Sequence, residues 1–376
     1  MFLGQQPNLL SQRSSLRRST FLLLLVIPFV ALAVIVGAFL GNGGTATIAE
    51  HVDGSSTPEP RDAPRVVDTL LSDTAATGLA PGLSRDSVRW FDVQSGRAYE
   101  GDLRTGVIRT ISDIAVPGFT DGIWVPGAEQ AFLIIEDARS GRRYQLYDYR
   151  TGSGHTLENA DHLAVSSNGS RIAYIGPGTD SGTVLRVADV DGSDERTILR
   201  TRLGVTDMAW KGEQAIILTV WRTGTSSTDL VVVSLDGDIA TLLSNKQNLE
   251  FTISRQGSVL ATYFDQSAKR VVAVLDPSTL LQRTMSEQTS ARKCAWAPDG
   301  ASLVCGIPQD ASVSQGSALA ATNDTLASID AGSGVLIDTI PTHEDRVGVY
   351  SPVISSSGTR AAFIDLFDRR VHMVSF

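Results

Sequence analysis

The two cysteines of this 376-residue sequence, Cys294 and Cys305, lie at either end of the stretch CAWAPDGASLVC. Thiols at this spacing could form a disulfide, bind a metal or provide a nucleophile. The sequence offers no third cysteine and no nucleophile motif, which favours a structural disulfide in an oxidising compartment. If Asp299 and Gly300 form a two-residue turn, the cysteines lie opposite each other on paired strands, within disulfide range. A bulge at Gly300 would shift this register, and two buried reduced thiols are the alternative.

Charged residues recur at the starts of predicted apolar strands. Acidic residues occupy this position in TDGIW, ADHLAV, TDMAW and LEFTI, and basic residues occupy it in RKCAW and EDRVGVY. Together they could form an acidic channel mouth that binds a cationic peptide or protein segment, with a contrasting basic sector. Solvated charges near strand ends are the alternative interpretation. The predicted partner-binding residues are Asp121, Asp161, Asp207, Glu250, Lys293 and Arg346.

The sequence lacks the motifs of several hydrolase classes. It contains no G-x-S-x-G elbow and no sialidase-type Asp-box, and no helical domain is left over to carry an α/β-hydrolase. The acidic stretch 189–195, DVDGSDE, lacks the spacing of an EF-hand and is interpreted as a turn. We therefore predict that the chain is not an enzyme and has no metal ligands or cofactor, although paired carboxylates from separate repeats are an alternative. The histidines that this interpretation leaves without a role are His51, His155, His162, His343 and His372.

A repeat of about 43 residues organises the chain. Each unit has an apolar strand, a turn that ends in glycine and a second apolar strand, followed by another hairpin about 20 residues later. Four short strands at this period predict the blades of an all-β propeller, because such sheets bury their faces only by stacking around an axis. The turn glycines are Gly82, Gly127, Gly169, Gly212, Gly257, Gly300 and Gly358, and they predict seven blades. Six blades with an irregular N-terminal cap are the alternative.

The ends of the repeat region predict how the ring closes. The last unit stops at Phe376 after three strands, and the apolar segment Arg65–Leu71 precedes the first unit. Pairing this segment in the last sheet would join the two ends and cover an exposed edge. The sixth unit carries an insertion, Ile307–Asp324, between its second and third strands. Loops of this length are usually functional or disordered, and its Ser, Ala and Gln content favours disorder.

The turns APDG, SSNG, RQGS and SSSG resemble those of TolB-like or PD40 propellers, a WD40-like type with an S-P-D-G-like turn in each blade. The resemblance covers about residues 65–376, and WAPDG comes nearest to the family's form. It implies a bacterial, exported propeller of six to eight blades that makes protein contacts or is appended to a peptidase. The Gly-His pair and Trp-Asp dipeptide of strict WD40 repeats are absent, so no functional residue is carried over.

The N-terminal region predicts a membrane anchor. Residues 21–41 carry no charge and have about the length, roughly 20 residues, of a bilayer-spanning helix. Arg13, Arg17 and Arg18 precede them, which orients the N-terminus toward the cytoplasm. A cleaved signal peptide is the alternative, but its apolar region is usually shorter. We therefore expect a cytoplasmic tail at 1–20, a signal anchor at 21–41, a flexible linker at 42–64 and an extracytoplasmic propeller at 65–376.

The charge balance restricts the partners of the exported part. All 41 acidic residues but only 29 of the 32 basic residues follow position 20, which leaves a net charge of −12 there. This balance disfavours nucleic acid and anionic lipid surfaces as partners. The predicted function is a protein-interaction platform for an envelope or extracellular protein or peptide. A propeller that binds or senses a small ligand or metal ion is the alternative.

Overall fold

The computed structural model describes residues 69–376, with gaps at 138–140, 179–181, 222–223, 311–320 and 343–345. Within these residues the secondary structure consists of strands and one short 3-10 helix, so the predicted all-β class is confirmed. The described part contains no helix with the length and apolar character needed to cross a bilayer. The tail, anchor and linker predicted at 1–20, 21–41 and 42–64 lie outside the described residues.

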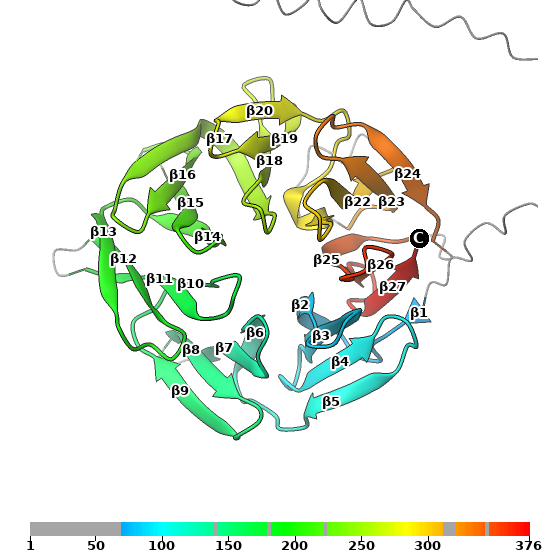
Figure 1. Ribbon diagram of the computed structural model, residues 1–376, viewed down its shortest axis with the longest axis horizontal. Coiled ribbons are helices and arrows are strands. Elements are labelled where there is room, and N and C mark those ends of the chain that lie inside the picture. The colour runs from blue at the N-terminus through cyan, green and yellow to red at the C-terminus, as the bar shows by residue number, and fades with distance from the viewer. Residues whose placement is uncertain (1–68, 138–140, 179–181, 222–223, 311–320, 343–345) are drawn as a thin grey trace, which may run out of the picture. The chain divides into compact units, whose positions relative to one another are not determined.

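Antiparallel sheets follow one another in chain order and form a ring in the unit Asp62–Phe376, as Figure 1 shows. The first sheet contains β2 (Ala76–Pro81), β3 (Ser87–Asp92), β4 (Ala98–Asp102) and β5 (Ile108–Ser112). The second contains β6 (Phe119–Trp124), β7 (Gln130–Asp137), β8 (Gly141–Asp148) and β9 (Ser153–Leu157). The third contains β10 (His162–Val165), β11 (Arg171–Pro177), β12 (Thr183–Asp189) and β13 (Arg196–Thr201).

The next two repeats share one strand. They form a single seven-stranded sheet, because β17 (Ile239–Ile253) pairs with β16 through its first half and with β18 through its second half. The sequence predicted two separate strands here. The other strands of this sheet are β14 (Val205–Lys211), β15 (Ala215–Trp221), β16 (Thr228–Ser234), β18 (Val259–Phe264), β19 (Arg270–Asp276) and β20 (Leu281–Thr284).

The last two sheets complete the ring. The 3-10 helix η1 (Ala291–Lys293) leads into β21 (Cys294–Trp296), β22 (Ser302–Pro308), β23 (Asp324–Asp330) and β24 (Leu336–Ile340). The final sheet contains β25 (Val349–Ile354), β26 (Arg360–Asp365) and β27 (Val371–Ser375), and its fourth strand is β1 (Thr69–Leu70) from the other end of the unit. Thr69 pairs with Met373 and Leu70 with His372, so the predicted closure is confirmed for these residues.

The first strand of each repeat lies innermost, and neighbouring inner strands contact one another around the ring. Contacts join β2 to β6, β6 to β10, β10 to β14, β14 to β17, β17 to β21, β21 to β25 and β25 back to β2. Residues near the ends of seven inner strands are therefore brought close to one axis, although they are far apart in the sequence.

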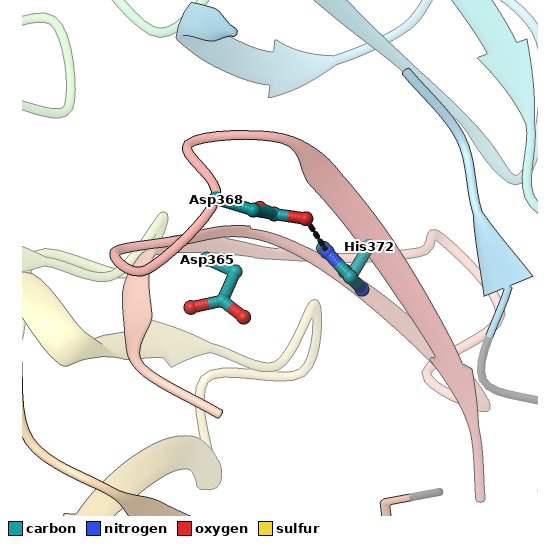
Figure 2. Close-up of side chains that lie close together, drawn as sticks. All are labelled: Asp365, Asp368 and His372. Carbon is teal, nitrogen blue, oxygen red and sulfur yellow. Dashed lines mark hydrogen bonds and ion pairs between the residues drawn. The ribbon is translucent and has the colours of Figure 1, made fainter. Parts of the chain in front are cut away.

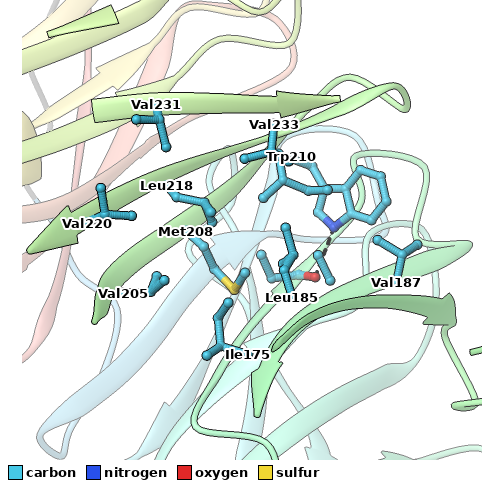
Figure 3. Packing of buried hydrophobic residues seen from close by; sticks show 13 residues of the cluster. Ile175, Leu185, Val187, Val205, Met208, Trp210, Leu218, Val220, Val231 and Val233 are labelled. Carbon is cyan, nitrogen blue, oxygen red and sulfur yellow. Dashed lines mark hydrogen bonds between the residues drawn. The ribbon is translucent and has the colours of Figure 1, made fainter. Parts of the chain in front are cut away.

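Apolar side chains of adjacent sheets pack face to face and hold the ring together. Figure 3 shows one such cluster, in which Leu185 of β12 packs near Met208 and Trp210 of β14. The Trp210 indole nitrogen donates to the carbonyl of Ala164 at 3.0 Å, so its one polar atom is satisfied inside the core. Burial of each large apolar side chain contributes roughly 1.5–3 kcal/mol, which no single sheet could obtain alone.

The predicted turn glycines mostly adopt left-handed backbone conformations. Six of the seven have positive φ angles, and Gly82 is the exception. Gly169 has φ +73°, and a Cβ there would lie 2.3 Å from the Pro126 carbonyl oxygen in the turn of the preceding sheet. Glycine is therefore required at this position both by the turn and by the contact between neighbouring turns.

Candidate functional site

Register shifts accompany three of the four predicted acidic residues, near the starts of β6 and β14 and in the second half of β17. The shifts occur between Phe119 and Asp121 on β6, between Val205 and Asp207 on β14, and between Gln247 and Glu250 on β17. A β-bulge changes the direction of the side chain that follows it. The same backbone irregularity therefore recurs at three of the four predicted acidic positions. We call Asp121, Asp161, Asp207 and Glu250 the inner-strand acids.

Each of the three acids at the bulges accepts hydrogen bonds from nearby groups. Asp121 Oδ1 accepts bonds from the Thr77 hydroxyl at 2.7 Å and from the Gly122 amide at 2.8 Å. Asp207 Oδ1 accepts one from the Met208 amide at 2.8 Å. Glu250 Oε2 accepts one from the Ser290 hydroxyl at 2.5 Å. These bonds hold the carboxylates in place while leaving other oxygens available.

An arginine that the sequence analysis missed lies between two of the inner-strand acids. The Arg292 guanidinium is 3.9 Å from Asp207 Oδ2 and 4.0 Å from Glu250 Oε1. It belongs to η1, which begins after Ser290, whose hydroxyl accepts a bond from the Arg292 amide. Residues from three successive repeats therefore converge here. We call Asp207, Glu250 and Arg292 the Arg292 cluster.

Lys293 does not face this cluster, and its predicted place at the channel mouth is wrong. Its side chain is 4% exposed, and its ammonium lies 2.6 Å from Asp324 Oδ2 and also contacts the Thr322 hydroxyl. Since η1 turns by about a third of a circle per residue, adjacent residues point in different directions. Arg292, one position earlier, takes the place predicted for Lys293.

Asp161 and Arg346, like Asp121, stay outside the Arg292 cluster. The side chain of Asp161, just before β10, is exposed. Arg346 is also exposed, and its guanidinium lies 3.8 Å from the ring centre of Phe367. Among the described residues, neither side chain joins an ion pair. Of the six predicted residues, only Asp207 and Glu250 are therefore joined, through Arg292. The other four lie outside this cluster, and Lys293 is buried.

Electrostatics set Asp207 apart from ordinary surface carboxylates. Burial raises the pKa of Asp207 above its usual value, although Arg292 and the Met208 amide act in the opposite direction. Its side chain is still 44% exposed, so solvent and ligands reach the carboxylate. Burial also lowers the pKa of the neighbouring His162, and Arg142 lowers it further. These effects favour the neutral imidazole, although Asp207 and Asp161 act on the pKa of His162 in the opposite direction.

A second group of chemically capable side chains lies in the closing sheet, where no metal ligands were predicted. One donor atom each from Asp365, Asp368 and His372 lie within 4.8 Å of one another. Figure 2 shows His372 facing Asp368, with 3.0 Å between Nε2 and Oδ2. Asp365 and His372 are buried, at 2% and 3% exposure. Two carboxylates and an imidazole are donors that divalent transition metals accept.

A pocket of about 590 Å³ lies away from the inner strands, between β9 and the sheet of β10–β13. Its lining includes both acidic and basic side chains. The Arg186 guanidinium lies 3.3 Å from Glu195, whose carboxylate also accepts a bond from the Tyr174 hydroxyl. These contacts pair Arg186 with Glu195 within the wall of the pocket.

The predicted disulfide joins Cys294 and Cys305, with their Cα atoms 4.1 Å apart. The two residues are direct partners on β21 and β22, as are Trp296 and Leu303, which confirms the predicted register. The turn is wider than predicted, because Ala297 and Ser302 form its closing hydrogen bond. Gly300 has a positive φ, but the loop keeps an even number of residues, and both sulfurs stay on one face.

The predicted insertion Ile307–Asp324 is partly ordered strand. β22 extends to Pro308 and β23 begins at Asp324, and residues 311–320 lie outside the described part. The disulfide joins β21 to β22, and the Lys293–Asp324 ion pair joins η1 to β23. Both links lie close to the ends of this insertion.

Comparison with known proteins shows the fold and leaves the family open. No family model matches the sequence, and no curated protein matches it. Among solved structures, an oligogalacturonate lyase in complex with manganese aligns with a TM-score of 0.59 and 14% identity, over 82% of this chain and 92% of the lyase. The β-propeller domain of Cps50 (Swd1) from Myceliophteria thermophila aligns with a TM-score of 0.57 and 12% identity, over 82% of this chain and 100% of that domain.

The structural matches confirm the expected β-propeller fold and agree with the resemblance to TolB-like and WD40-like propellers. TolB from Acinetobacter baumannii aligns more weakly, with a TM-score of 0.46 and 14% identity, over 72% of this chain and 63% of TolB. At these identities the likeness concerns the fold alone.

The prediction that this chain is not an enzyme is corrected by the lyase. A structure that shares this fold over most of its length is named as an oligogalacturonate lyase, so the propeller does not exclude catalysis. The prediction relied on missing sequence motifs. In a propeller, catalytic side chains can come from separate blades and leave no local motif.

Proposed function

We propose that the chain is a binding protein whose inner-strand acids hold a cationic segment of a partner protein. The proposal rests on the position of Arg292, because the chain itself places one guanidinium between Asp207 and Glu250. Its contacts of 3.9 and 4.0 Å are at the limit of an ion pair, so a partner's arginine or lysine can compete for the same carboxylates. Asp121 and Asp161 make no ion pair among the described residues and add unbalanced negative charge.

The proposal also covers the number of blades and the location of the propeller. We count the seven-stranded sheet as two blades that share β17, which makes a seven-bladed propeller. Residues 21–41 would anchor it in the membrane, with the propeller on the extracytoplasmic side. The net charge of −12 after position 20 supports an electrostatic attraction of cationic partners. Propellers commonly use their loop-bearing faces for such contacts.

The test measures binding of a fluorescent octa-arginine peptide to the full-length protein, with octaglutamate as the reversed-charge probe. The double variant Asp161→Asn/Asp207→Asn should bind octa-arginine roughly tenfold more weakly, a loss of about 1.4 kcal/mol. Asp236→Asn/Asp338→Asn is the control with the same change in net charge, because both residues lie away from the inner strands. Equal losses in the two double variants would show non-specific attraction and contradict the proposal.

Arg292→Gln provides a test in the opposite direction. Removing the chain's own guanidinium leaves Asp207 and Glu250 without their competing cation, so octa-arginine should bind several-fold more tightly. A weaker complex would mean that Arg292 positions the site for some other ligand. This outcome would also contradict the proposal.

The pH dependence follows from the raised pKa of Asp207. Binding requires the ionised carboxylate, so it should weaken as the pH falls through that raised value. This decrease should begin at a higher pH than protonation of ordinary aspartates near 3.8 would give. In Asp207→Asn, the part of the pH profile due to this residue should be absent.

A further inference from the structure

The turn between β26 and β27 contains three acceptor groups close together. Asp365 ends β26, Asp368 lies within the turn and His372 follows on β27. Asp365 Oδ1 accepts bonds from the amides of Gly348 at 3.0 Å and Phe367 at 2.9 Å. Its other oxygen, Oδ2, accepts no hydrogen bond from any described residue. The carboxylate is nonetheless only 2% exposed.

The equivalent turn in the first sheet contains a hydrogen-bond donor at the position of Asp368. Trp90 pairs and stacks with Tyr99 across β3 and β4, as Phe363 pairs and stacks with His372 across β26 and β27. This pairing aligns Asp92 with Asp365 and Ser95 with Asp368. In the first sheet the Ser95 hydroxyl donates to Asp92 Oδ1 at 2.6 Å.

The closing sheet thus replaces a donor with an acceptor. Where Ser95 donates a proton to Asp92, Asp368 places a second carboxylate beside Asp365, and His372 replaces Tyr99. The carboxylate of Asp365 is buried and that of Asp368 is 37% exposed, and both lie close to the His372 imidazole, so a cation bound among the three would offset the two negative charges.

We propose that Asp365, Asp368 and His372 bind a divalent first-row metal ion. Carboxylate oxygens with one imidazole suit Mn²⁺ or Zn²⁺ better than Mg²⁺ or Ca²⁺, which prefer all-oxygen sites. The 3.0 Å between His372 Nε2 and Asp368 Oδ2 is close to the separation of adjacent ligands on one such ion.

The metal would stabilise the closure of the ring. His372 is the direct partner of Leu70 on β1, and β1 contains only two residues. A metal bound to His372 and to the end of β26 would hold β27 in the position that β1 pairs with. The proposed ion is therefore structural, and it acts where the two ends of the described unit meet.

The experiment uses full-length protein that has been treated with a chelator and dialysed. Bound Mn²⁺ and Zn²⁺ are measured separately by equilibrium dialysis with elemental analysis, and the melting temperature is recorded with and without each ion. We expect about one ion per chain and a higher melting temperature when the ion is bound. Mg²⁺ and Ca²⁺ at the same concentration should give a smaller shift.

Asp368→Ser is the decisive variant, because it recreates the turn of the first sheet. The new hydroxyl can donate to Asp365 and accept from the Arg370 amide, as Ser95 does with Asp92 and Arg97. This variant should bind the metal at least about tenfold more weakly. Without metal it should melt at or above the temperature of the parent protein.

Asp368→Asn removes the charge while keeping an acceptor for Arg370, and it should also lose metal binding. Asp265→Asn is the control, because Asp265 holds another turn through the amides of Ser267 and Lys269. Unchanged metal binding in both Asp368 variants would overturn the proposal. A metal-free Asp368→Ser protein that melts well below the parent would also overturn it. That result would mean that Asp365 gains nothing from a hydroxyl donor at position 368.

Discussion

Arg292 and Lys293 are neighbours in the sequence but lie in different environments. The side chain of Arg292 is 44% exposed beside Asp207 and Glu250, whereas the side chain of Lys293 is buried against Asp324. A buried ion pair adds little net stability, but removing one partner leaves an uncompensated charge. At the scale of single residues, Lys293 therefore serves stability, and Arg292 belongs to the candidate binding site.

Asp324→Asn tests this assignment for Lys293. Asparagine can still accept the bond from the Val349 amide, so the variant removes mainly the negative charge. It should lower the free energy of unfolding by roughly 3–5 kcal/mol, as measured by urea denaturation. Burial lowers the pKa of Lys293, so the loss should shrink as the pH rises toward that pKa and the ammonium deprotonates.

The double variant Lys293→Met/Asp324→Asn controls for other effects at this position. It removes both charges, and most of the stability lost in Asp324→Asn should return. If the double variant is as unstable as the single one, the buried charge is not the cause of the loss.

At the scale of elements, the β21–β22 hairpin combines three features that support one another. The turn glycine Gly300 keeps the register, the register places Cys294 opposite Cys305, and the disulfide then joins the two strands. β21 has only three residues, so its pairing alone supplies few hydrogen bonds. The covalent link compensates for this short inner strand.

Cys294→Ala/Cys305→Ala should lower the free energy of unfolding by about 3 kcal/mol in the chain-entropy model, because the open chain gains freedom when it unfolds. Guanidinium denaturation with and without a reductant measures this effect. Reductant added to the unfolded protein should destabilise the parent protein by a similar amount and leave the double variant unchanged. A parent protein that is insensitive to reduction would contradict a stabilising role for the disulfide.

At the scale of the whole propeller unit, stability depends on joining segments from opposite ends of the chain. Leu71 follows β1 and is 1% exposed in the apolar cluster between the last and first sheets. Its amide donates to the Val371 carbonyl oxygen at 2.7 Å, which extends the closure beyond the two paired residues of β1. Loss of this contact should therefore affect the ring and not only one strand.

Leu71→Ala should lower the free energy of unfolding by roughly 2–5 kcal/mol, because it leaves a cavity between two sheets that must stay in contact. Leu281→Ala is the matched control on β20, where the side chain is 59% exposed, and it should change stability by no more than about 0.5 kcal/mol. Denaturant melts of both variants measure the difference. Similar losses in the two variants would contradict the importance of the closing contact.

The sequence by itself determined the features that repeat or act locally. The period of turn glycines predicted the strands, and the alternation around Cys294 and Cys305 predicted their pairing. The inner-strand acids were found because each stands at a similar distance from its turn. Such features follow from backbone geometry over a few residues, so one segment contains the information needed.

Only the tertiary structure decided which side chains meet. It replaced Lys293 with Arg292 beside Asp207, merged two predicted strands into β17, and placed His372 next to Asp365. The physical reason is that bulges, a 3-10 turn and strand pairing set side-chain directions, and ring closure brings distant strands together. The chemistry of this propeller therefore depends on contacts between residues whose spacing in the sequence carries no motif.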